Sequence, residues 1–174
     1  PYYATVKLLW EKNNRPELYG QAYKLQTAAD YPVMKLTGKA ITDYSNASLI
    51  GIAFDIVNRK WDKGLIEELG LNPDLFPDVY PCHEVIGEVT REAAERTGLS
   101  PGTPVVAGTV DCNAAWVAGG CTETGDMSLV MGTAGVMGIV HEEPRFTRNM
   151  ITIIHTADSE TKYTTLAALV SCGA

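Results

Sequence analysis

The sequence contains few cysteines, few histidines and too little positive charge to balance its acids. Its four cysteines form no CxxC pair, so we expect free thiols rather than a disulfide framework. The three histidines have no HxxxH partner, and we therefore expect no metal site built from protein side chains. Asp and Glu outnumber Lys and Arg by 21 to 14, for a net charge of −7, which argues against nucleic acid as a partner.

Long apolar runs are also lacking. No stretch approaches the roughly 18 residues that a membrane helix needs, and no signal peptide is visible, so we expect a cytoplasmic protein without a membrane partner. Hydrophobic residues still make up 45% of the chain, which is enough to build a core. The chain lacks an initiator Met and begins inside a helical pattern, which predicts an internal segment of a longer protein.

Helical signals dominate the first 120 residues and strand signals follow them. The spacing of Val6, Leu9 and Trp10 predicts one face of a first helix over 5–12. Caps and apolar periodicity predict further helices over 16–23, 31–36, 62–69 and 91–97. Apolar runs predict strands at 85–89, 105–107, 127–131, 136–141, 151–156 and 163–170. This change of pattern predicts a domain boundary near residues 120–125.

Two less regular segments interrupt the helical part. Residues 42–48 are dense in capping and turn residues and are predicted to form a polar loop, with a ligand loop as the functional alternative. Residues 73–81 contain three prolines and are predicted to form an extended, linker-like excursion.

Asp111 is the strongest single candidate for chemistry. It follows the apolar strand predicted at 105–107 and opens a helix of small residues. One interpretation is a helix N-cap, a common use of Asp at such a junction. The other is a catalytic carboxylate, because α/β folds bind substrates at the carboxyl ends of their strands. The two interpretations are compatible, since a helix N-terminus stabilises negative charge.

Gly132 and Thr133 follow the apolar run 127–131 and are the second candidate. They read either as a plain hairpin turn or as a phosphate loop, in which glycine lets the backbone approach the ligand and Thr133 offers a hydroxyl. The pattern is neither GxxxxGK[ST] nor GxGxxG, and a strand rather than a helix is expected after it. A Walker P-loop and a dinucleotide-binding site are therefore disfavoured.

Several motifs taken together resemble the FGGY family of carbohydrate kinases. Lys7-Leu8-Leu9-Trp10 is similar to the family's K-apolar-x-W helix. Leu36-Thr37-Gly38, followed by the residues 42–48, is similar to its LTG…TDxSNAS segment. Asp111 then falls on the family's catalytic aspartate, and Gly132-Thr133 falls on its Gly-Thr phosphate element. The order and spacing of these motifs carry the resemblance, which extends over nearly the whole chain.

The resemblance implies an α/β protein with the two-lobed, ribonuclease H-like fold of actin and hexokinase-type ATPases, only partly covered by this chain. Residues 1–122 would form the C-terminal part of the first, sugar-binding lobe, and residues 123–174 would begin the second, ATP-binding lobe. ATP and Mg²⁺ are the implied cofactors, and a small sugar or polyol is the implied substrate. The resemblance leaves a homodimer open.

The implied activity is ATP-dependent phosphorylation of a sugar or polyol hydroxyl, with a pentulose such as xylulose or ribulose favoured. Asp111 would contact the substrate and act as general base, while Gly132 and Thr133 would bind the ATP phosphates. Tyr2 resembles an aromatic residue that lines the polyol pocket of glycerol kinases, although a place in the core or an interface is the alternative. Glycerol, other polyols and an autoinducer remain alternative substrates.

Two functions of other classes stay open. The chain alone is expected to be inactive, so it could be a catalytically incomplete piece with only a structural or binding role. An actin-like ATPase without a sugar substrate is the other alternative, and the TDYSNAS stretch argues against it because that stretch resembles the sugar kinases.

Overall fold

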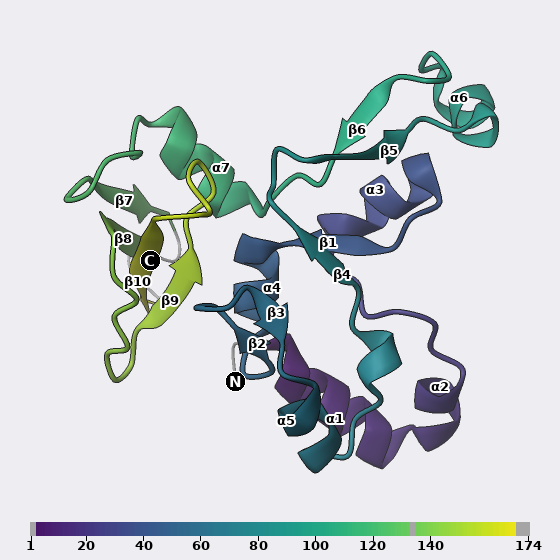
Figure 1. The fold of residues 1–174 in the computed structure, drawn as a ribbon, viewed down its shortest axis with the longest axis horizontal. Coiled ribbons are helices and arrows are strands. Elements are labelled where there is room, and N and C mark those ends of the chain that lie inside the picture. The colour runs from purple at the N-terminus through teal and green to yellow at the C-terminus, as the bar shows by residue number, and fades with distance from the viewer. Residues whose placement is uncertain (1–2, 133–134, 170–174) are drawn as a thin grey trace. The chain divides into compact units, whose positions relative to one another are not determined.

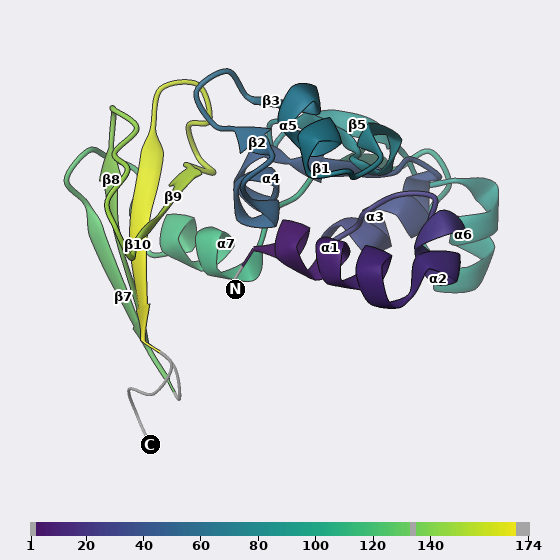
Figure 2. The same ribbon diagram turned by 90° about the horizontal axis from the view of Figure 1, so that it is seen from below.

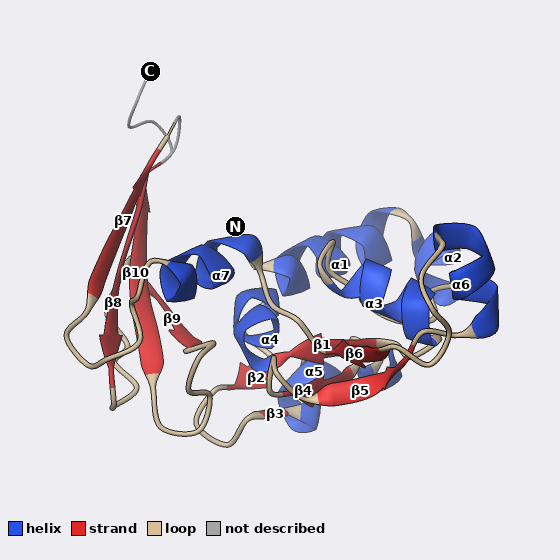
Figure 3. Cartoon of the chain, turned by 90° about the horizontal axis from the view of Figure 1, so that it is seen from above, coloured by secondary structure: helices blue, strands red, loops and turns tan. Residues whose placement is uncertain are grey.

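The computed structural model describes residues 3–132 and 135–169, and the chain divides into two compact units, residues 1–109 and 110–174 (Figure 1). Most of the described helices belong to unit 1, whereas unit 2 contains a four-stranded β-sheet (Figure 3). The chain is therefore of the α/β class, as the sequence predicts. In the described residues, no helix combines the length and apolar content required to span a bilayer.

Unit 1 is built from short elements. Its helices are α1 (Ala4–Asn14), α2 (Pro16–Gly20), α3 (Asp30–Thr37), α4 (Tyr44–Ile50), α5 (Lys63–Glu68), α6 (Arg91–Thr97) and the 3₁₀ turn η1 (Pro73–Leu75). Its strands are β1 (Ile41–Asp43), β2 (Phe54–Asp55), β3 (Lys60–Trp61), β4 (Asp78–Tyr80), β5 (Val85–Glu88) and β6 (Pro104–Val106). The strands pair two by two: β1 with β4 in parallel, and β2 with β3 and β5 with β6 antiparallel.

Caps fix the helix ends in unit 1 where the sequence predicts them. Asp62 accepts a hydrogen bond from the backbone N–H of Leu65 and begins α5, and Thr90 does the same for α6 through the N–H of Ala93. Gly38 and Gly98 end α3 and α6 in the left-handed conformation, at φ of 76° and 77°. A residue with a side chain is strained there, so these glycines are the natural stop signals.

The face of α1 that packs against the core of unit 1 is not the face predicted from the sequence. Its main apolar cluster is formed by Ile50, Ala53, Ile66, Leu71, Leu75 and Phe76. Ala4, Leu8 and Leu9 of α1 pack against this cluster, whereas Val6 and Trp10 are exposed. The reason is a buried hydrogen bond from the Thr5 hydroxyl to the carbonyl of Ile50, which turns the Thr5 face of α1 inward.

The two irregular segments predicted for unit 1 contain regular structure. Residues 42–48 are the end of β1 and most of α4, not a loop, because the Asp43 carboxylate caps the helix at this junction. Residues 73–81 contain η1 and β4, not a linker, because β4 pairs with β1 and the neighbouring Leu75 and Phe76 are core residues. Short strands of three residues leave no periodicity that sequence reasoning could detect.

Unit 2 consists of one helix and one antiparallel sheet. The helix is α7 (Asp111–Ala118), and the strands are β7 (Met127–Met131), β8 (Gly135–His141), β9 (Ile151–Ile154) and β10 (Tyr163–Leu169). The strand order is β7-β8-β10-β9, with every pair antiparallel. Figure 2 shows these four strands as a single twisted sheet. All four strands of this unit are predicted from the sequence to within a few residues at their ends.

The two faces of the sheet in unit 2 differ in what packs against them. α7 packs on one face through the buried side chain of Trp116, which lies over Gly138 of β8. A Cβ atom added at Gly138 would lie 2.9 Å from Cη2 of Trp116, so only glycine lets the helix approach this closely. Met127, Leu129, Met137 and Ile139, which register as neighbours on β7 and β8, are exposed on the other face.

Candidate active site

Asp111 is the first residue of α7 and is exposed to solvent. Val110, not Asp111, occupies the N-cap position, with extended φ and ψ of −70° and 145°. The N-cap interpretation of Asp111 is therefore wrong in detail, although Oδ1 does accept a 2.7 Å hydrogen bond from the backbone N–H of Cys112. This arrangement leaves a carboxylate in the first helical turn, where the helix dipole stabilises negative charge and solutes can reach it.

Gly132 lies directly after β7 and is also exposed. Met131 at the end of β7 pairs with Gly135 at the start of β8, and β8 is the strand that the sequence predicts after Gly132. Thr133 lies outside the described residues, as does Tyr2 at the other end of the chain. Asp111 and Gly132 thus both belong to unit 2, one at the start of its helix and one between its first two strands.

Asp43 is a functional candidate that sequence reasoning did not single out. Its side chain is only 1% exposed, and it ends β1 at the point where α4 begins. Its Oδ1 accepts hydrogen bonds from the backbone N–H of Ser45 at 2.9 Å and from the hydroxyl of Thr109 at 3.2 Å. The N–H of Asn46 lies 3.4 Å from both carboxylate oxygens. The available signal was the Asp two residues before the SNAS stretch, which reads as a helix cap.

The electrostatics around Asp43 are unusual for a capping residue. Burial, the largest cause, and the nearby carboxyl of Asp30 together raise the pKa of Asp43 to about 6, against the lowering effect of its N–H and hydroxyl donors. Burial likewise raises the pKa of Asp30, whose Oδ2 accepts a hydrogen bond from the N–H of Thr27. Unit 1 therefore holds two neighbouring buried carboxyl groups for which the protonated form is favoured more than in water.

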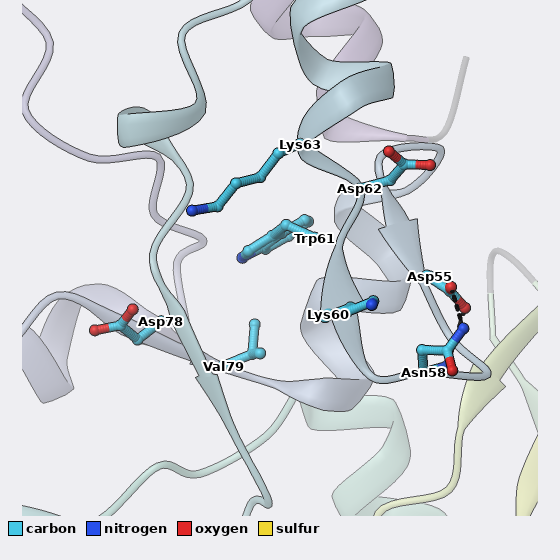
Figure 4. A pocket seen from close by; sticks show the side chains of 8 residues that line it. All are labelled: Asp55, Asn58, Lys60, Trp61, Asp62, Lys63, Asp78 and Val79. Atoms are coloured by element: carbon cyan, nitrogen blue, oxygen red, sulfur yellow. Dashed lines mark hydrogen bonds between the residues drawn. The ribbon is translucent and has the colours of Figure 1, made fainter.

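A pocket of about 650 Å³ opens elsewhere in unit 1 (Figure 4). It is lined by Asp55, Asn58, Lys60, Trp61, Asp62, Lys63, Asp78 and Val79. Two of its three carboxylates already cap local structure, Asp55 for its own turn and Asp62 for α5. Trp61 is fixed by the hydrogen bond from its indole N–H to the carbonyl of Pro77, at 2.7 Å. Asp111 and Gly132 do not line this pocket, and we assign no catalytic group to it.

No metal centre is formed by the described side chains. Across residues 3–132 and 135–169, no three His, Cys, Asp or Glu side chains gather closely enough to hold an ion. Mg²⁺ is commonly held by substrate phosphates and water together with one or two carboxylates. The described residues do not form a protein cage for Mg²⁺.

The fold matches solved structures of sugar kinases. Xylulose kinase from Rhodospirillum rubrum gives a TM-score of 0.90 at 29% identity, over 98% of this chain and 34% of that one. Glycerol kinase from Plasmodium falciparum gives a TM-score of 0.81 over 93% of this chain and 33% of that one, at 20% identity, so that likeness concerns the fold alone. The chain therefore has part of the ribonuclease H-like α/β fold of the sugar kinases.

Sequence comparison narrows this class to one family. Residues 1–118 match the model of the FGGY family of carbohydrate kinases, N-terminal domain. An autoinducer-2 kinase from Yersinia enterocolitica is 36% identical over 130 residues, which are 75% of this chain and 24% of that protein. One from Yersinia pestis is 34% identical over 152 residues, which are 87% of this chain and 28% of that protein. The chain belongs to the FGGY family of carbohydrate kinases, and it spans about a quarter of the length of these curated relatives.

Proposed function

We propose that the full-length protein transfers the terminal phosphoryl group of ATP to a hydroxyl group of a sugar or polyol, with Asp111 as the general base. Membership of the FGGY family supports the reaction class. The observation that carries the role of Asp111 is its position, because its exposed carboxylate stands in the first turn of a helix that follows β6 after a connection of four residues. Substrates of α/β folds bind at this kind of junction.

Asp111 would orient the attacking hydroxyl and accept its proton. In a loose phosphoryl-transfer transition state there is little covalent chemistry for the protein to do, so positioning of the nucleophile provides most of its contribution. The carboxylate keeps one oxygen for this task, because the Cys112 N–H bonds to Oδ1 and no hydrogen bond to Oδ2 is formed by the described residues.

Gly132 and Thr133 are proposed to bind the phosphates of ATP. Gly132 is exposed in a bend directly after β7, beyond the last pair of the ladder, Met131 with Gly135. Backbone N–H groups in such turns form concave sites for anions. Mg²⁺, when bound with ATP, would neutralise charge on the phosphate oxygens. Tyr2 is proposed as a contact of the sugar.

A pentulose such as xylulose or ribulose is the proposed substrate, and autoinducer-2 is the second candidate. The likeness to R. rubrum xylulose kinase favours the first, at 29% identity over almost the whole chain. The relatives named as autoinducer-2 kinases favour the second, since they are 34–36% identical over shorter stretches. We further propose a cytoplasmic location and a lobe boundary at residue 122.

A coupled assay of ADP release by the full-length protein would test this function. We expect ATP consumption that depends on the added acceptor, with xylulose or ribulose giving the highest kcat/KM in a panel that also includes glycerol, gluconate and autoinducer-2. A preference for autoinducer-2 would replace the first candidate with the second. Absence of acceptor-dependent turnover across the panel would contradict the kinase proposal. Calorimetry of the 174-residue chain with ATP and sugar would test the alternative of a binding piece, which predicts that one of the two ligands still binds.

A further inference from the structure

The bond between Asp43 and Thr109 joins residues that are 66 positions apart in the sequence. Both residues belong to unit 1, and Thr109 is its last residue. Thr109 precedes Asp111 by two positions, so a buried carboxylate at the start of α4 holds the chain just before the proposed base. The bond is part-buried, which protects it from competition with water.

Other contacts fix the same stretch of backbone up to Gly108. The N–H of Ala107 donates to the carbonyl of Glu84 at 3.0 Å, and the N–H of Gly108 donates to the carbonyl of Cys82 at 2.9 Å. Gly108 then turns with φ of 76°, which takes the chain away from this pairing. The Thr109 hydroxyl provides the next long-range anchor along the chain.

Capping of α4 does not by itself require a carboxylate. Asn and Asp are equally effective as N-cap residues, and an amide oxygen would accept the same N–H bonds without the penalty of burying a charge. An ionised carboxylate does, however, accept a stronger hydrogen bond from a hydroxyl than an amide does. The hydrogen bond from the Thr109 hydroxyl is therefore the one that is stronger with a carboxylate than with an amide. It also joins Asp43 to a residue outside α4.

We propose that Asp43 is a positioning residue that fixes, through the hydroxyl of Thr109, the backbone leading into Asp111. The inference rests on the proposed role of Asp111 as the base. Loss of the Thr109 anchor frees the backbone two residues before Asp111, and misplacement of a reacting group by about 1 Å can reduce turnover by about 10²-fold. Asp43 itself is buried and does not contact the substrate.

The anchor is expected to weaken at acidic pH. The groups that face Asp43 are the carboxyl of Asp30 on α3 and the thiol of Cys82, which precedes β5, and neither brings positive charge. With a pKa raised to about 6, mainly by burial, Asp43 becomes protonated as the pH falls through this value and accepts a weaker bond from Thr109. Turnover should therefore decrease below about pH 6 in a way that Asp43→Asn removes.

The test compares Thr109→Val, which removes the hydroxyl and keeps the shape, with Thr109→Ser, which keeps the hydroxyl. In the full-length protein we expect Thr109→Val to lower kcat by about 10- to 100-fold with the KM of the sugar changed less than about threefold. Thr109→Ser should stay within about threefold of the wild type. Hydrogen exchange of the peptide covering residues 107–112 should be faster in Thr109→Val alone.

Each outcome decides the proposal. A kcat of Thr109→Val within twofold of the wild type would overturn it, and so would equal losses in the Val and Ser variants. If the wild type shows no acceptor-dependent turnover, the proposed function fails, and hydrogen exchange still tests the anchor. Unchanged exchange in Thr109→Val would then overturn the anchor independently. A pH profile of Asp43→Asn that keeps the wild-type decrease near pH 6 would contradict the role of the carboxylate.

Discussion

Two helices of this molecule begin at or next to an aspartate, and the two aspartates have opposite environments. Asp43 at the start of α4 is 1% exposed and accepts hydrogen bonds from two helical N–H groups and from Thr109, whereas Asp111 at the start of α7 is exposed and bonds only to the N–H of Cys112 among the described residues. The same residue type at the start of a helix can therefore be buried among hydrogen-bond donors or exposed to solvent. Burial, not position, distinguishes the two.

The helices behind these aspartates are also held differently. α4 is fixed at its first turn by polar bonds to Asp43 and is buried along most of its length. α7 has no side-chain cap, and it is fixed by the packing of Trp116 on the sheet of unit 2. An exposed reactive carboxylate needs a rigid support that does not use the carboxylate itself. Packing of Trp116 over Gly138 provides such a support.

The largest expected effect is the loss of turnover when Asp111 is replaced. Asp111→Asn in the full-length protein should lower kcat by about 10²- to 10⁴-fold, because an amide cannot accept the proton of the attacking hydroxyl. Steady-state kinetics with the best acceptor of the panel would measure this. Asp78→Asn, a change at an exposed acid on β4, is the matched control and should keep wild-type kinetics. Near-normal turnover of folded Asp111→Asn would contradict the role of Asp111 as general base.

The second prediction concerns the effect of pH on stability at Asp43. Its pKa of about 6 in the folded protein lies above the ordinary Asp value of 3.8, so protonation favours folding and ionisation opposes it. The cost of the charge is absent below about pH 4, grows between pH 4 and 6, and is fully present above pH 6. Asp43→Asn keeps the cap without the charge, so it should gain stability relative to the wild type as the pH rises, by up to about 3 kcal/mol.

Urea unfolding of both proteins at pH 4.5 and pH 7.5 would measure this difference. Asp30 is also buried with a raised pKa, but it is present in both proteins, so most of its effect cancels. A difference in unfolding free energy that is the same at the two pH values would show that the Asp43 carboxyl is not destabilised by burial.

The sequence predicts those features of the two regions that depend on neighbouring residues. α7 begins at Asp111 as predicted, and the strands of unit 2 follow from their apolar runs. The environment of Asp43 could not be predicted, because it depends on Thr109 and Asp30, which are distant in sequence and carry no common pattern. For the same reason β1 and β4 were missed, since a parallel pair of three-residue strands forms only through tertiary contact.

For the candidate site too, the sequence identifies some residues but does not establish their roles. Asp111 and Gly132 are candidates from their place in the sequence, and the resemblance to FGGY kinases implies their roles; the structure has them at the start of α7 and directly after β7. Their roles, together with those of Tyr2 and Thr133, stay predictions. The exposed Val6 and Trp10 of α1 show the limit of periodicity: one buried hydrogen bond from Thr5 was enough to rotate the face that packs inward.

A third prediction tests the apolar support of α7. Gly138→Ala should destabilise the sheet of unit 2 by about 1–3 kcal/mol, because the added methyl group would lie 2.9 Å from Trp116 and 3.2 Å from Thr164. Thermal or urea unfolding would measure the loss. Gly20→Ala is the control: no atom lies within 4 Å of its added Cβ, so this helical site should gain up to about 1 kcal/mol. Equal stability of Gly138→Ala and the wild type would mean that α7 does not depend on this contact.

The smallest expected effect is that of Asp111→Asn on stability. Because Val110 occupies the N-cap position and Asp111 is exposed, the charge should contribute only its interaction with the dipole of α7, about 0.3–1 kcal/mol. Added salt screens this interaction, so the difference in unfolding free energy from the wild type should shrink between 0.05 M and 0.5 M NaCl. A loss well above 1 kcal/mol that salt does not reduce would indicate a structural role like that of Asp43. A small, salt-sensitive loss together with a large loss of turnover is the combination that a general base on an independently supported helix requires.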